Sequence, residues 1–177
     1  MQNYLELKIP VSYEAEWFKA LRQEAEKRHI PVRWQHGYYH ITVIFSYDDK
    51  KKEELKESFS RVIATHEAFT MTLDKIDAFA ASKHVIYLTA SLPSLELNNL
   101  IDELRAGANQ MHANIRPDFR LHITLGKVDS AAATIEQVQD LTGSIDVPAF
   151  NVRITELEYQ YLDHSMPSIG KWHMKTN

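Results

Sequence analysis

The sequence predicts a two-lobed protein in which strands and helices alternate. Three observations support this fold class. The order strand, long helix, strand, helix, strand occurs once before about residue 80 and once after it. A His-x-Thr-apolar pattern lies in the middle strand of each half, at His40–Val43 and at His122–Leu125. These patterns follow the first strand of their half by about 35 and about 37 positions, which is typical of an internal repeat. Alternation of strands and helices along the chain favours a parallel sheet. The spacing of apolar residues, however, does not determine the direction of the strands.

The first half of the chain reads as strands that alternate with amphipathic helices. Apolar, β-branched runs predict strands, and apolar residues three or four positions apart predict helices. Ser12 is a suitable N-cap for the first helix. In chain order we expect a strand at Tyr4–Pro10, a helix from Ser12 to about Arg28 with Trp17, Leu21 and Ala25 inward, a strand at Tyr39–Phe45, a helix opened by Asp48–Glu54 with Leu55, Phe59 and Val62 inward, and a strand at Phe69–Phe79.

The second half follows the same order. The inward phase of the run Val152–Leu162 changes part-way, which indicates a β-bulge near Thr155 and Glu156. In chain order we expect a turn at Ala80–Lys83, a strand at Val85–Ser91, a helix with its stripe over Leu97–Met111, a strand at Leu121–Val128, a helix near Ala131–Leu141, strands at Ser144–Phe150 and Val152–Leu162, and a short strand at Gly170–Lys175.

Composition limits the classes of protein and partner. With 177 residues, of which 44% are hydrophobic and 25% charged, the chain fits one soluble domain or two small lobes. The formal charge of −4 argues against binding to a long duplex nucleic acid, but it allows a small anionic substrate. The chain has no cysteine, so disulfides, thiol nucleophiles and thiolate metal sites are excluded. Without a signal-peptide pattern or a membrane-length apolar run, we expect a cytoplasmic protein.

Each duplicated motif presents an imidazole and a hydroxyl on one face of its strand. Side chains alternate along a strand, so His40 and Thr42 share a face while Ile41 points the other way. His122 and Thr124 are arranged in the same manner. Random placement gives roughly 0.2 such patterns per chain, and two of them in roughly one chain in fifty. Two half-buried strand histidines remain the alternative, but two pairs that face each other would surround one small anion.

Three stretches of sequence carry a resemblance to a known family. They are His40–Phe45, Phe119–Lys127 and Leu162–Ser165. Through them the chain resembles the 2H phosphoesterase superfamily, and within it the 2′,5′-RNA-ligase-like and cyclic phosphodiesterase branch. The family commonly has Pro before the second His, where this chain has Leu121, and a basic residue after the Gly, where it has Lys127.

The resemblance implies an α+β fold with two pseudo-symmetric lobes. Each lobe would be an antiparallel sheet flanked by helices, with a groove between the lobes, and this replaces the expectation of a parallel sheet. Residues 1–177 would form a single bilobal domain, with one lobe at about 1–80 and the other at about 81–177, and strands could exchange between the lobes.

The predicted function is metal-independent hydrolysis of a 2′,3′-cyclic phosphate or a 2′,5′-phosphodiester. Opening such a bond needs one proton to leave water and one to reach the departing oxygen, and imidazole can do either near neutral pH. His40 and His122 are therefore the expected acid–base pair, although their sequence does not assign the two roles. Thr42 and Thr124 are expected to donate to the phosphoryl oxygens, as in an oxyanion hole. Simple strand propensity remains the alternative for the threonines.

Further residues are expected to contact the substrate. Lys127 fits the basic position of the family, but its odd separation from His122 puts it on the opposite strand face unless the strand ends or bulges at Gly126. Ser165 is expected from the resemblance of the C-terminal segment. Tyr38 and Phe45, and also Trp34 and Trp172, are candidates for stacking on a nucleobase, and Arg116 and Arg120 for holding a phosphate, with core packing or surface solvation as the alternatives.

The expected partner is a small nucleotide or an RNA end that carries a cyclic phosphate. No cofactor and no metal site is expected, because HExxH and other spaced ligand sets are absent from the sequence. We expect a monomer without a membrane partner. Three other functions remain open: a module that binds RNA ends or nucleotides without turnover, an ATP-independent 2′,5′-RNA ligase, and a phosphoesterase for a metabolite unrelated to nucleic acid.

Overall fold

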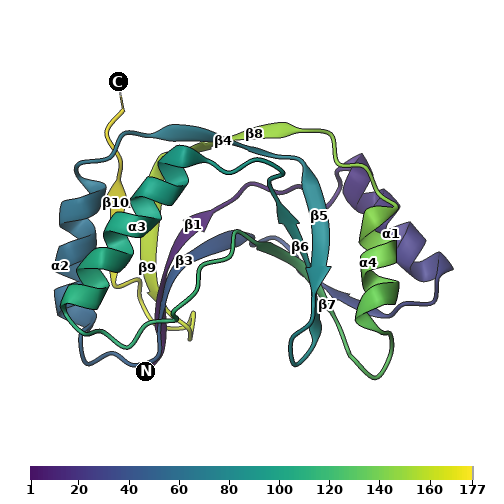
Figure 1. Cartoon of the computed structure of the whole chain (residues 1–177), viewed down its shortest axis with the longest axis horizontal. Coiled ribbons are helices and arrows are strands. Elements are labelled where there is room, and N and C mark those ends of the chain that lie inside the picture. The colour runs from purple at the N-terminus through teal and green to yellow at the C-terminus, as the bar shows by residue number, and fades with distance from the viewer. Residues whose placement is uncertain (177) are drawn as a thin grey trace.

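The strands and helices form an arch whose concave side lies between two antiparallel sheets (Figure 1). This computed structural model describes residues 1–176, and within them it contains ten strands and four helices. Every pairing between its named strands is antiparallel. The α+β fold class expected from the sequence resemblance is therefore confirmed, and the parallel arrangement suggested by alternation alone is wrong.

Two four-stranded sheets form the two sides of the arch. The first sheet has the order β10-β9-β1-β3 and packs against α2 and α3, and the second has the order β2-β7-β6-β5 and packs against α1 and α4. A third sheet of β4 and β8 lies across the top of the arch in Figure 1. The bounds are β1 Asn3–Lys8, α1 Glu16–Lys27, β2 Val32–Trp34, β3 His40–Ser46, α2 Lys52–Ile63, β4 Phe69–Leu73, β5 Lys75–Phe79, β6 His84–Thr89, α3 Leu95–Gln110, β7 Ile123–Val128, α4 Ile135–Gly143, β8 Phe150–Ile154, β9 Glu156–Tyr161 and β10 Gly170–His173.

Each four-stranded sheet contains strands from both halves of the sequence. Between β1 and β3, which belong to the first sheet, the chain passes through α1 and β2 on the other side of the arch. In return, Ile115 of the second half forms a bridge with Ser46 at the end of β3. We propose that the two sheets with their helices are the lobes of a single domain.

Equivalent backbone features recur in the two halves. The residues that follow the C-caps of α1 and α3, His29 and His112, both adopt left-handed conformations with φ of 56° and 52°. The β1–β3 register shifts between Leu5 and Glu6, and the β6–β7 register shifts between Ile86 and Tyr87. Each motif strand therefore carries a one-residue bulge directly after its threonine. Bulges at matching points indicate that the two halves share one backbone geometry, as an internal repeat would.

Several element boundaries differ from the sequence expectations. The expected strand Phe69–Phe79 is two strands, β4 and β5, which belong to different sheets. The phase change near Thr155 is likewise a crossing from β8 to β9 rather than a bulge within one strand. The strand expected at Ser144–Phe150 is wrong, since β8 only begins at Phe150. Ser12 does not cap α1, because its hydroxyl accepts from the Glu14 N–H in the preceding turn.

One contiguous cluster of buried apolar side chains runs behind both sheets. It includes Ile41 and Ile123, the central residues of the two motifs, which are both 0% exposed. None of the helices within residues 1–176 is long and apolar enough to cross a membrane.

We predict opposite stability effects for alanine at two glycines. A Cβ at Gly126 on β7 would lie 2.7 Å from Val32 Cγ1 and 2.9 Å from Trp34 Cε3, so Gly126→Ala should lower the free energy of unfolding by about 1–3 kcal/mol through overpacking. Gly143 ends α4 in open space, so Gly143→Ala should raise that free energy by up to about 1 kcal/mol. Urea unfolding measures both. Equal effects at the two glycines would contradict the close approach of β2 to β7.

Candidate functional site

The first motif lies on β3, the edge strand of its sheet, and the second at the start of β7, which lies between β2 and β6. His40 and Thr42 are partly exposed on β3 while Ile41 between them is buried, and His122 and Thr124 have the same relation to Ile123 on β7. The expected sharing of one strand face by each imidazole and hydroxyl is thus what the burial pattern shows. Their chemical roles remain a prediction.

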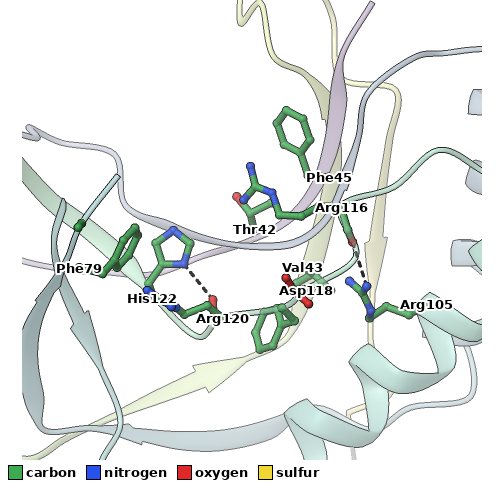
Figure 2. A pocket seen from close by; sticks show the side chains of 11 residues that line it. Thr42, Val43, Phe45, Phe79, Arg105, Arg116, Asp118, Arg120 and His122 are labelled. Atoms are coloured by element: carbon green, nitrogen blue, oxygen red, sulfur yellow. Dashed lines mark hydrogen bonds between the residues drawn. The ribbon is translucent and has the colours of Figure 1, made fainter. Parts of the chain in front are cut away.

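A pocket of about 300 Å³ joins residues of the two motifs. In Figure 2, Thr42, Phe45 and Arg116 lie along one side of it, and His122 and Phe79 along the other. Three guanidinium groups and one carboxylate line the same pocket, those of Arg105, Arg116, Arg120 and Asp118. The lining therefore combines aromatic rings with a net positive charge, which suits an anion attached to a flat ring.

The ring of His122 is held by the backbone. Its Nδ1 lies 2.9 Å from the carbonyl oxygen of Arg120, so an Nδ1–H donates to that oxygen and Nε2 keeps its lone pair. Phe79 and Tyr87 pack edge-on against the imidazole, with ring centroids 5.6 and 6.1 Å away. Burial lowers the pKa of His122, the carbonyl bond offsets part of this, and the charges of Arg116 and Arg120 lower the pKa further. The net effect keeps Nε2 available to accept a proton.

His40 lies in a different environment on the opposite strand. The rings of Tyr4 and Tyr38 flank its imidazole with centroids 5.5 and 5.2 Å away. Burial lowers the pKa of His40 to about 4, with further lowering from the charges of His164 and His122. The imidazole of His122 is therefore within electrostatic reach of His40 although it belongs to the other sheet.

Two of the four aromatic residues expected to stack on a base, Phe45 and Tyr38, have separate surroundings. Phe45 lines the pocket, and the guanidinium of Arg116 lies 4.8 Å from its ring centroid. Tyr38 lies beside His40, where its hydroxyl donates to the buried carboxylate of Glu6. Tyr38 is thus engaged in the wall of the site, whereas the Phe45 ring faces the pocket.

Lys127 lies on the strand face of His122 but outside the pocket. The bulge at Leu125 reverses the alternation, so Lys127 comes to the sheet face of His122 despite the odd separation. Its exposed side chain lines another depression, with Arg33, Lys83 and Asp129. Contact of Lys127 with the reacting phosphate therefore remains a prediction.

The C-terminal segment approaches the site through a histidine rather than through the expected serine. The Ser165 N–H donates to Asp163 Oδ1, and the residue is exposed. The neighbouring His164 lies with its Nε2 3.2 Å from the Tyr4 hydroxyl oxygen, beside the ring of Tyr38. His164 was not among the expected site residues, because nothing local in the sequence distinguishes it from a surface histidine.

The two arginine candidates line the pocket, and the two tryptophan candidates do not. Arg120 lines the pocket with its guanidinium 4.4 Å from the centroid of Phe79, just as Arg116 covers Phe45. Both tryptophans instead pack on the core, Trp34 against Phe18 and Trp172 against Phe59.

Other residues of the site were missed by sequence reasoning. Arg105 comes from α3, where one of its guanidinium nitrogens donates to the Arg116 carbonyl oxygen 2.9 Å away. Asp118 and Phe79 have no distinguishing sequence context. Glu6 did carry a signal, because it is a charged residue within an apolar strand. Over residues 1–176 no three potential metal ligands of the His, Asp or Glu type come together.

We predict that both site imidazoles are neutral in the free protein at pH 7. An NMR titration should show His40 with a pKa of about 4 and His122 with a pKa below the usual 6.5, because burial disfavours the charged form of each ring. A pKa of His40 at or above the usual range would contradict its desolvation.

Comparisons with known proteins agree with this geometry. The family model described as the 2'-5' RNA ligase superfamily matches residues 10–164. The solved structure of E. coli LigT complexed with 3'-AMP is similar in fold, with a TM-score of 0.70, 19% identity and 98% of each chain covered. The structure of TT0787 of Thermus thermophilus gives a TM-score of 0.68 at 14% identity over 99% of each chain. At these identities the structures show a shared fold alone. A search of curated proteins finds no match.

The family match spans most of the chain and includes both motifs with their histidines, one on each sheet. The chain therefore belongs to the 2'-5' RNA ligase superfamily of 2H phosphoesterases.

Proposed function

We propose that the protein is a metal-independent phosphoesterase that opens 2′,3′-cyclic phosphates or 2′,5′-phosphodiesters of nucleotides or RNA ends. The observation that carries the proposal is a pair of desolvated imidazoles from the motifs of two different sheets, His122 in the lining of a positively charged pocket and His40 two residues from Thr42, which lines the same pocket.

The proposed reaction is an in-line displacement at phosphorus. One imidazole takes a proton from water as its oxygen bonds to phosphorus, and the other gives a proton to the ribose oxygen as its bond to phosphorus breaks. Nucleophile and leaving group lie on opposite sides of the phosphorus atom, so the two imidazoles must approach from different directions. His40 on β3 and His122 directly before β7 come from two different sheets and suit this geometry, whereas two histidines on one strand face would not.

The threonines and arginines have complementary parts in this scheme. The Thr42 and Thr124 hydroxyls would donate to the non-bridging oxygens, whose charge grows in the transition state. Arg116 and Arg120 would attract the substrate phosphate, since charge-assisted hydrogen bonds to phosphate are strong. The phenylalanines of the lining offer ring faces or edges to a nucleobase or ribose. That solved structures of E. coli LigT contain 3'-AMP, NADP+ or ATP supports a nucleotide-like substrate here.

RNA ligation is the second candidate, favoured by the description of the matching family. The same two proton transfers, run in the opposite direction, would join a ribose hydroxyl to a cyclic phosphate. A panel of 2′,3′-cyclic nucleotides, 2′,5′-linked dinucleotides and RNA ends with a cyclic phosphate would separate hydrolysis, ligation and binding without turnover.

We predict that replacement of either imidazole lowers turnover by orders of magnitude. His40→Ala and His122→Ala should each lower kcat by about 10²–10⁴, because each removes one of the two proton transfers. Their far-UV circular dichroism should match that of the unchanged protein. Addition of EDTA should leave the rate of the unchanged protein unaltered, and a loss of activity with EDTA would redirect the mechanism towards a metal. An unaffected rate in either histidine variant would defeat the assignment.

We predict smaller losses for the threonines. Thr42→Val and Thr124→Val preserve shape on a strand but remove the hydroxyl, so each should cost about 2.7–4 kcal/mol of transition-state stabilisation if it acts as an oxyanion donor. The loss should appear in kcat more than in KM, because the donated bonds strengthen as charge develops. Unchanged kcat in both variants would leave the threonines with strand propensity alone.

A further inference from the structure

Glu6 is a fully buried carboxylate beside one of the two motifs. It lies on β1 opposite Thr42 of β3, in the register that also pairs Lys8 with His40, and it is 0% exposed. A buried carboxyl group costs several kcal/mol unless its oxygens are satisfied. Packing alone would be served better by an apolar residue at this position.

The two oxygens of Glu6 have different surroundings. Oε1 accepts hydrogen bonds from the Tyr38 hydroxyl and from Gln160 Nε2, the latter at 2.5 Å. Oε2 is buried and has no hydrogen-bond partner among residues 1–176. It lies 3.9 Å from His40 Nδ1. The fully satisfied oxygen anchors the carboxylate, and the unsatisfied one is next to the imidazole.

The other half of the molecule has no such carboxylate. The position equivalent to Glu6 is Tyr87, which lies opposite Thr124 directly after the matching register shift. On that side the Nδ1–H of His122 donates to the Arg120 carbonyl oxygen. The two imidazoles therefore differ in what lies behind them: a neutral carbonyl for His122 and a carboxylate for His40.

We propose that Glu6 is a positioning residue that accepts the Nδ1–H of His40 when an anionic phosphate occupies the site. The inference rests on the proposed function and assigns its two roles. The carboxylate stabilises the imidazolium of His40, whose Nε2–H then faces the leaving oxygen, so His40 is the acid. His122, kept neutral by burial and by neighbouring arginines, is the base. A side-chain adjustment is enough to bring Glu6 Oε2 and His40 Nδ1 from 3.9 Å to hydrogen-bond distance. Hydrogen bonds between catalytic groups often shorten when substrate binds.

The charges around the pair explain why phosphate should trigger the change. Burial raises the pKa of Glu6 and lowers the pKa of His40, so the free pair disfavours the ionised form of both groups. An anion next to Nε2 favours the imidazolium, and a carboxylate behind Nδ1 favours it further. The other titratable groups around the pair are Tyr4 and Lys8 from β1, Tyr38 before β3, Glu158 from β9, His164 after β9 and His122 from the other sheet.

Glu6→Gln tests the proposal because glutamine keeps an oxygen for Tyr38 and Gln160 while it removes the carboxylate. The pKa of His40 would be measured by NMR in the free protein and with saturating inorganic phosphate. Phosphate should raise the pKa of His40 in the unchanged protein, and in Glu6→Gln the rise should be smaller by about 1 pH unit or more. The alkaline limb of the kcat profile should move to lower pH by a similar amount, because kcat reports the groups of the substrate complex.

Two further variants keep the test decisive. Glu156→Gln removes a carboxylate from β9, where Glu156 pairs with Lys171 and is not among the groups around the pair, and it should leave the alkaline limb in place. Glu6→Asp retains a carboxylate and should shift the limb less than Glu6→Gln, which also covers a Glu6→Gln protein that fails to fold. A pKa of His40 that ignores phosphate, or equal phosphate responses with and without the carboxylate, would overturn the proposal. If His40 responds as expected but no ester is cleaved, the proposed function fails and the role of Glu6 stands.

Discussion

Burial of Ile41 and Ile123 is the constraint on which the site depends. Both side chains are completely buried at the centre of a motif, so the residues on either side must turn to the opposite face of their strand. A slip of one residue would place His40 in the apolar core and expose its neighbour. The hydrophobic effect acting on two isoleucines thus determines where two imidazoles and two hydroxyls point. Packing of the two isoleucines behind the sheets therefore sets where the reactive side chains lie on the concave surface.

The bulges extend this control beyond the motifs themselves. By adding one residue directly after each threonine, they bring Phe45 and Lys127 to the face that carries the histidines. In the first half this places an aromatic ring in the pocket, and in the second it places a cation farther along the same sheet. The repeat therefore preserves geometry while the side chains at equivalent positions differ. The same divergence separates Glu6 from Tyr87 and makes the two halves of the site chemically unequal.

Much of this arrangement could be predicted from the sequence. Features set by neighbouring residues were predictable, whereas contacts between distant parts of the chain were not. The i, i+2 relation within each motif is local, and the alternation of burial around Ile41 is a direct consequence of strand geometry. The short strand β2 gave no signal, because three residues are too few for periodicity. The change of sheet at Thr155 looked like a bulge, since both events reverse the inward phase. Contacts such as Tyr4 with His164 join opposite ends of the chain and leave no local pattern.

A structure of the protein with a bound phosphoryl transition-state analogue, such as a nucleoside vanadate, would test the central claim most directly. We expect the vanadium atom between the Nε2 atoms of His40 and His122, each within hydrogen-bond distance of an apical oxygen on opposite sides. The equatorial oxygens should accept bonds from Thr42 and Thr124. Binding of the analogue at the exposed depression beside Lys127, with the two imidazoles untouched, would contradict this mechanism.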